Sequence, residues 1–180
     1  ISAVLSGDGG ISKGGSGRLT LSGNNTYSGD TTISAGTLAF GNLNALGGGT
    51  LSFTGNSTLQ SAAAGTLANA LSIDAGVTAT FDSQSNANVL SGGIGGSGGL
   101  VKIGAGTLTL SGSNTYSGGT TISEGIVAVA SAAALPTTGT VSVADGSQLQ
   151  ISGNQAFSAT LDLAGDLSGR GSLRSETGSN

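Results

Sequence analysis

The sequence of 180 residues predicts an all-β protein whose chain coils into a β-solenoid, and three observations predict this fold. Residues 10–40 occur again at 99–129, with 20 of the 31 positions identical. Short segments alternate apolar residues with Ser or Thr, the period-2 pattern of a strand with one buried face. Corners that contain Gly separate these segments, and Gly adopts the positive φ that sharp bends require.

The duplication predicts units that stack and complete one another's core. An offset of 89 positions aligns three stretches without a difference, namely 19–23 with 108–112, 25–29 with 114–118, and 31–34 with 120–123. Repeats on this scale are typical of solenoids, in which each unit contacts only its neighbours. Four coils of about 22 residues would fill the period. We therefore expect little or no α-helix, and the same environment for 19–21 as for 108–110.

The expected strands are all short. They lie at 19–21, 31–33, 37–40, 50–53, 71–73 and 77–81, and then at 100–103, 107–110, 120–122, 126–129, 140–143, 149–151 and 160–163. Gly corners precede strands at 34–36, 74–76, 123–125 and 144–146. An antiparallel sandwich is the alternative all-β fold, but it gives no reason for so close a repeat.

We expect one solenoid over residues 1–180. Its parts are the tail of a preceding unit (1–9), a first unit (10–98), a partly diverged second unit (99–173) and a polar, frayed end (174–180). Beyond the second copy the offset grows from 89 to 90, which places one extra residue at 135–138, beside Pro136. An insertion within a strand would turn later side chains to the wrong face, so we expect a turn there. Repeat material at both ends indicates a piece of a longer chain.

Composition limits the chemistry. The chain has no His and no Cys, which excludes a Ser-His-Asp triad, a Cys nucleophile and the usual zinc sites within it. Its net charge is −4, with five basic residues and few aromatic ones, so a nucleic-acid surface is not expected. No apolar run approaches the length that a membrane-spanning helix needs, so direct membrane insertion is not expected either. We expect no catalytic residue, cofactor or metal.

Carboxylate pairs are the remaining route to catalysis. The closest pairs are Asp74 with Asp82 and Asp162 with Asp166, and glycoside hydrolysis needs two carboxyl groups beside a sugar-binding cleft. The scarcity of aromatic side chains leaves little for a sugar ring to stack on. The Gly-rich stretch 92–99 lacks the Gly-Lys-Ser/Thr ending of a phosphate-binding loop, so we expect corners there.

We interpret the residues that recur in the repeat as structural. Tyr27 and Tyr116 are either adhesive contact points or, as we prefer, rings that cover a corner of the core with the hydroxyl in water. Asn25 and Asn114 are expected to bond backbone at a bend. The positions to which we assign a structural role are Lys13, Leu19, Leu21, Asn25, Tyr27, Gly29, Ile33, Gly36, Lys102, Leu108, Leu110, Asn114, Tyr116, Gly118, Ile122 and Gly125.

The segment 104–125, Gly-Ala-Gly-Thr-Leu-Thr-Leu-Ser-Gly-Ser-Asn-Thr-Tyr-Ser-Gly-Gly-Thr-Thr-Ile-Ser-Glu-Gly, resembles the passenger-associated transport repeat. The copy at 15–36 resembles it too, with differences that include Arg18, Asp30 and Ala35. The resemblance implies a right-handed parallel β-helix from the passenger of a Gram-negative autotransporter. In that family a C-terminal outer-membrane β-barrel carries the passenger outward, and the repeat is thought to assist passenger folding and export.

The function implied by this resemblance is that of a non-catalytic stalk, located extracellularly or on the bacterial surface. Its expected partners are the barrel of the parent chain and, for adhesion, host or bacterial surface molecules or a second copy. The alternative is a polysaccharide-acting enzyme or a glycan-binding module on a β-helix scaffold.

Overall fold

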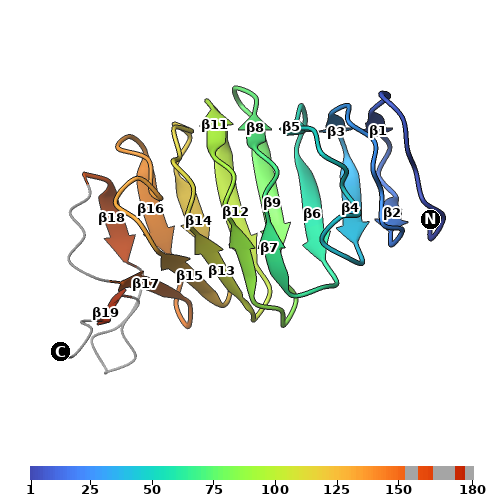
Figure 1. The fold of residues 1–180 in the computed structure, drawn as a ribbon. Helices are drawn as coiled ribbons and strands as arrows, with labels where there is room; N and C mark the ends of the chain where they lie inside the picture. The colour runs from blue at the N-terminus through green and yellow to red at the C-terminus, as the bar shows by residue number, and fades with distance from the viewer. Residues whose placement is uncertain (153–157, 164–172, 177–180) are drawn as a thin grey trace.

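The computed structural model describes residues 1–152, 158–163 and 173–176, and within them the chain forms nineteen β-strands and no α-helix. Every strand pairing is parallel. Figure 1 shows the coils stacked side by side from the blue N-terminal end to the red C-terminal end. The chain is therefore a parallel β-solenoid, as the sequence predicts.

Three sheets run along this solenoid. The five-stranded sheet contains β1 (Ile11–Lys13), β3 (Thr31–Ile33), β5 (Leu51–Phe53), β8 (Leu71–Ile73) and β11 (Ile94–Gly96). The eight-stranded sheet contains β2 (Arg18–Leu21), β4 (Gly36–Phe40), β6 (Ser57–Ser61), β9 (Thr78–Asp82), β12 (Gly99–Ile103), β14 (Thr120–Ile122), β16 (Thr140–Val143) and β18 (Thr160–Leu163). The six-stranded sheet contains β7 (Gly65–Leu67), β10 (Asn88–Leu90), β13 (Thr107–Leu110), β15 (Ile126–Val129), β17 (Gln148–Ser152) and β19 (Leu173–Glu176).

Strand register gives the length of each coil. In the five-stranded sheet Ile11 pairs with Thr31, and Thr31 pairs with Leu51, so two successive coils have the same length. A later coil is slightly longer, since Leu71 pairs with Ile94. Both lengths lie close to the expected coil of about 22 residues. The expected frayed end overlaps β19, so the backbone of residues 174–176 pairs with β17.

Rows of apolar side chains fill the interior. In the eight-stranded sheet Leu38, Leu59 and Phe81 lie in register on consecutive coils, and each is at most 1% exposed. The intervening residues Thr58 and Thr80 point outward and are partly exposed. This alternation repeats from coil to coil, so a side chain in the core packs mainly against its equivalents one coil above and one below.

The two copies of the repeat do not occupy the same sheets, contrary to the expectation for 19–21 and 108–110. The first segment lies in β2 of the eight-stranded sheet, and the second lies in β13 of the six-stranded sheet. In the strand register, the residue that lies four coils beyond Gly36 is Thr120. In the sequence repeat, the residue equivalent to Gly36 is Gly125. The repeat period is therefore longer than four coils. The second copy consequently begins about one face further round the coil.

The extra residue of the second unit lies outside the strands. Thr31 pairs with Leu51, whereas its repeat equivalent Thr120 pairs with Val141, one position beyond the equivalent of Leu51. Residues 130–139, between β15 and β16, contain no strand and include Pro136. Residues 135–138 form bends outside the strands, where the change of direction was expected, and the strands on both sides keep their apolar side chains inward.

Candidate functional site

The two lysines of the repeat hold corners of successive coils together. Both are buried, with 6% of Lys13 and 0% of Lys102 exposed. The Nζ of Lys102 donates to the carbonyls of Ile103 (2.9 Å), Gly104 (2.7 Å) and Glu124 (3.2 Å). An ammonium has three donors, so this group is fully satisfied. The third bond crosses to the next coil.

Lys13 makes the same arrangement in the first copy. Its Nζ donates to the carbonyls of Gly14 (2.9 Å), Gly15 (2.8 Å) and Ala35 (3.0 Å), the last of which lies on the next coil. The two ammonium groups therefore face inward to backbone oxygens, and neither is available to a ligand from solvent.

Lys102 shares its surroundings with two carboxylates. Burial lowers the pKa of Lys102 to about 8, although the charges of Asp82 and Glu124 favour the protonated form. Burial acts to raise the pKa of Asp82, but hydrogen bonds from Gln60 and Gln84, with the charge of Lys102, outweigh it and leave that pKa below its ordinary value. The two carboxylates and the three carbonyl acceptors offset part of the cost of burying the Lys102 ammonium at this corner, but burial remains the largest influence on its pKa.

The tyrosines are core residues with bonded hydroxyls, which corrects the expectation of a hydroxyl in water. Tyr27 is 3% exposed and Tyr116 is 0% exposed. The Tyr27 hydroxyl lies 2.6 Å from the Oγ1 of Thr31, and the Tyr116 hydroxyl lies 2.5 Å from that of Thr120. Burial raises the pKa of Tyr116 to about 12. Neither ring can act as an adhesive contact point in the folded chain.

The asparagines of the repeat each join three coils. Asn114 accepts the N–H of Ile94 (2.8 Å) through Oδ1 and donates through Nδ2 to the carbonyl of Ala134 (2.5 Å). Asn25 repeats both bonds with Leu5 and Ala45. The asparagines are 7% and 5% exposed, so these bonds satisfy polar groups that water cannot reach easily.

The remaining repeat positions fill the core or form bends. Most of the apolar ones are completely buried, namely Leu21, Ile33, Leu108, Leu110 and Ile122, while Leu19 is partly buried. Gly36 and Gly125 have φ values of 68° and 71°, in the region that favours Gly. At Gly29 and Gly118 a Cβ atom would collide with the backbone of Gly9 and Gly98 on the preceding coil.

Asp74 and Asp82, the pair that the structure describes in full, lie in different surroundings. Asp74 is exposed before β9, and Asp82 ends that strand with its carboxylate bonded to Gln60 and Gln84. Asp162 is exposed on β18, and Asp166 lies outside the described residues. Residues 92–98 form β11 and the corners on both sides of it, and Gly99 begins β12.

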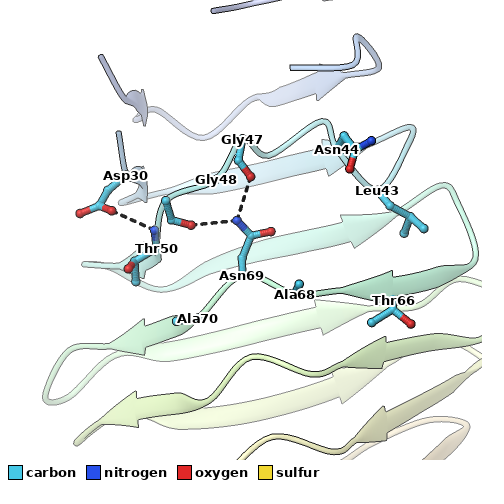
Figure 2. Close-up of a pocket in the computed structure, with 11 residues that line it drawn as sticks. Asp30, Leu43, Asn44, Gly47, Gly48, Thr50, Thr66, Ala68, Asn69 and Ala70 are labelled. Carbon is cyan, nitrogen blue, oxygen red and sulfur yellow. Dashed lines mark hydrogen bonds between the residues drawn. The ribbon is translucent and has the colours of Figure 1, made fainter. Parts of the chain in front are cut away.

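A groove of about 330 Å³ is lined by residues of three successive coils, where the six-stranded sheet begins. It is lined by Asp30, Leu43, Asn44, Gly47, Gly48, Gly49, Thr50, Thr66, Ala68, Asn69 and Ala70 (Figure 2). The Asp30 carboxylate accepts the N–H of Thr50 (2.8 Å) through one oxygen. Asn69 donates through Nδ2 to the carbonyls of Gly47 (3.0 Å) and Gly49 (2.8 Å).

Sequence reasoning missed this groove. Asp30 is one of the positions at which the first copy differs from the second, where Gly119 takes its place. This difference between the copies is the one feature of the sequence that could have drawn attention to Asp30. Nothing in the sequence pattern connects Asp30 with Asn69, which lies two coils further along the chain. The repeated residues build scaffold, whereas the groove depends on residues that are not repeated.

Two further observations limit the kinds of site in the described part of the chain. There, no group of three or more carboxylates lies close enough together to hold a metal ion. Residues 1–152, 158–163 and 173–176 also contain no helix of the length and hydropathy needed to span a membrane.

Stacked parallel coils with a duplicated corner define this chain as a β-solenoid assembled from sequence repeats. The repeat is the passenger-associated transport repeat, whose family model matches residues 11–40 and again residues 100–129. The resemblance seen in the sequence is thereby confirmed at both copies. The family model does not match residues 41–99, which contain the strands beside the groove.

A curated relative points to the same group of proteins. The chain is 37% identical over 123 residues to the adhesin BmaC autotransporter of Brucella suis biovar 1 (strain 1330). The match covers 63% of this chain and 3% of the relative, so the chain is similar to a small part of a much longer protein. No solved protein structure matches the chain.

Proposed function

We propose that the chain is a non-catalytic stalk segment of an autotransporter passenger, displayed on the bacterial surface and carrying adhesive contacts on its lateral faces. The observation that carries this proposal is the pair of passenger-associated transport repeats, built into one continuous stack of coils. The relative named as an autotransporter adhesin supports the surface location and the adhesive role. The parent chain would supply the outer-membrane barrel that anchors or releases the passenger.

The repeat would assist export by folding locally and templating the next coil. Each repeated Lys and Asn bonds to the coil that follows, so a folded coil presents partners for the next one. Growth by addition to an existing end is the expected behaviour of a solenoid, whose units contact only their neighbours. This segment has no Cys, so no disulfide within it would have to be reduced before the chain crosses the outer membrane.

Surface display tests the export role. The chain is placed between a secretion signal and an autotransporter barrel, and surface exposure is measured by the access of an external protease. Asn114→Ala is expected to lower the exposed fraction, and Ser113→Ala, at the exposed neighbouring position, serves as the matched control. Equal exposure of both variants, with Asn114→Ala shown to destabilise the purified chain, would contradict the export role.

Beads coated with the purified chain test the adhesive role. We expect them to bind cultured epithelial cells more than beads coated with an unrelated soluble protein. The rival function, hydrolysis of polysaccharides, predicts release of reducing sugar from plant or bacterial glycans, and loss of that release in Asp82→Ala. The proposed function predicts none.

A further inference from the structure

The groove lies where the stacking of coils changes. The five-stranded sheet still continues there through β5 and β8, and the six-stranded sheet starts with β7. Residues 43–50 of one coil therefore face residues 66–70 of the next without forming a ladder (Figure 2). Because the two backbone segments do not pair, space remains between them. Some hydrogen-bonding groups at the walls of this space therefore have no partner within the described part of the chain.

Four residues that line this space have backbone N–H groups without a partner among the described residues. Within the part of the chain that the structure describes, the N–H groups of Gly49, Ala68, Asn69 and Ala70 make no hydrogen bond to another residue. The carbonyls of Gly47 and Gly49 are held by the Nδ2 of Asn69 instead. Asn69 is 9% exposed, and its Oδ1 has no partner among the described residues, so a fixed acceptor remains at the wall.

Side chains add further donors and acceptors. Asp30 uses one carboxylate oxygen for the N–H of Thr50, which orients the carboxylate and leaves its second oxygen free of any described partner. The side chains of Asn44 and Thr66 are exposed and likewise make no hydrogen bond to the described residues. Leu43, partly exposed, supplies an apolar wall. The groove therefore combines polar groups, of which Asp30 and Asn69 are held by hydrogen bonds, with the apolar surface of Leu43, so it is more polar than most small-ligand sites.

The charge and composition of the groove limit the classes of ligand that it can bind. The groove contains one carboxylate and no basic residue, so it disfavours phosphate, sulfate and acidic sugars. It contains no aromatic residue on which a nucleobase could stack. Its volume of about 330 Å³ is at the small end of ligand pockets, large enough for one or two sugar rings. Neutral sugars present the many hydroxyl groups that such fixed donors and acceptors can bind.

We propose that this groove binds a neutral saccharide through hydrogen bonds to its hydroxyl groups. The proposal rests on the adhesive function proposed above and names the chemistry of one contact. The site belongs to the first repeat unit alone. In the second unit Gly119 replaces Asp30, and Ala159 occupies the position that corresponds to Asn69 at the offset of 90. The scaffold is thus duplicated, but the binding groups are not.

Saturation-transfer NMR and titration calorimetry on the full chain test this site with defined probes. The neutral probes are maltotriose, cellotriose, triacetylchitotriose and N-acetyllactosamine, and 3′-sialyllactose is the anionic comparison. We expect at least one neutral probe to bind with a dissociation constant of about 1 mM or below. Asp30→Asn keeps an acceptor for Thr50 but removes the charge, and it is expected to weaken binding about tenfold.

Two other variants keep the test decisive. Thr66→Val removes an exposed hydroxyl at nearly constant shape and is expected to weaken binding severalfold. Asp74→Asn removes an exposed carboxylate outside the groove and is expected to leave binding unchanged. Binding of no neutral probe, undiminished binding in both groove variants, or tighter binding of 3′-sialyllactose would overturn the proposal. If coated beads adhere to cells while any of these results holds, the inference fails and the adhesive function stands. If the beads do not adhere, the adhesive function fails by itself.

Discussion

The hydroxyl of Tyr116 and the Oγ1 of Thr120 lie 2.5 Å apart inside the solenoid, and Tyr27 and Thr31 repeat the contact at 2.6 Å. Each pair closes a bend of the repeat with a hydrogen bond that water cannot replace, because Thr31 and Thr120 are at most 1% exposed. The two copies keep this contact although they begin on different faces of the coil. The bend is therefore a local structure that the repeat carries with it.

Removing one partner of this bond tests its contribution. Tyr116→Phe leaves the Thr120 hydroxyl buried without its partner, so we expect the free energy of unfolding to fall by about 1–3 kcal/mol. Thr120→Val should have a similar effect. In the double variant both polar groups are gone, so the loss should be smaller than the sum of the single losses. Chemical denaturation of the four proteins measures this, and strict additivity would contradict the coupling.

The buried lysine predicts a rise of stability with pH. The pKa of Lys102 is about 8 in the folded chain and 10.5 in its ordinary state, so the unfolded chain binds more protons between these values. Stability should therefore rise as pH increases from 8 to 10, by up to about 2 kcal/mol once solvent screening is allowed for. Above pH 10 the raised pKa of Tyr116 acts in the opposite direction. Denaturation curves from pH 7 to 10 measure the slope. Lys102→Met should flatten it, and an equal slope in that variant would assign the effect to other groups.

The asparagine that joins three coils should be costly to remove. Asn114→Ala leaves the N–H of Ile94 and the carbonyl of Ala134 without their side-chain partner. We expect a loss on the order of 2–5 kcal/mol in the free energy of unfolding, since each unsatisfied buried group costs about 1–3 kcal/mol. Ser113→Ala, at the exposed neighbouring position, should change stability by less than about 0.5 kcal/mol. Comparable losses in both variants would remove the special role of Asn114.

Substitution of two glycines by Ala separates the loss of stability due to backbone strain from the loss due to close packing of the coils. Gly125 and Gly146 have φ values of 71° and 75°, so Ala is strained at both. A Cβ at Gly125 would lie 2.6 Å from the carbonyl oxygen of Gly106, whereas a Cβ at Gly146 would meet nothing within 4 Å. Thermal unfolding should show a loss of about 1 kcal/mol for Gly146→Ala. Gly125→Ala should lose about 1–3 kcal/mol more. Equal losses would mean that the stacked corners are not tightly packed.

Much of the fold could be predicted from the sequence because its apolar residues alternate with Ser and Thr. All thirteen expected strands are present, with ends displaced by at most one residue. Most of the strands that were not expected contain a single large apolar residue. Examples are β7 (Gly65–Leu67) and β11 (Ile94–Gly96), both of which also contain Gly. Register with neighbouring coils makes these segments strands, and that register is a tertiary property.

The candidate site could not be predicted, for a related reason. Asn25 bonds to backbone groups as expected, but its partners Leu5 and Ala45 lie on the two adjacent coils, and the ring of Tyr27 packs against Gly47 on the next coil. The hydroxyl of Tyr27 could therefore be expected in water until this packing was known. The groove depends on coils that fail to pair, and no local pattern signals an absent hydrogen bond. The mismatch between the repeat period and a stack of four coils is likewise visible only in the register.

Distances between spin labels along one face test the stacked-coil architecture most directly. Thr37, Val101, Thr121 and Ser142 lie in register on outward positions of the eight-stranded sheet, and the chain has no native Cys to interfere with labelling. With Thr37 labelled in each pair, the account predicts separations of about 14 Å to residue 101, about 19 Å to residue 121 and about 24 Å to residue 142, an increase of about 4.8 Å per coil. Distances that fail to grow in this order, as in a sandwich of antiparallel strands, would contradict it.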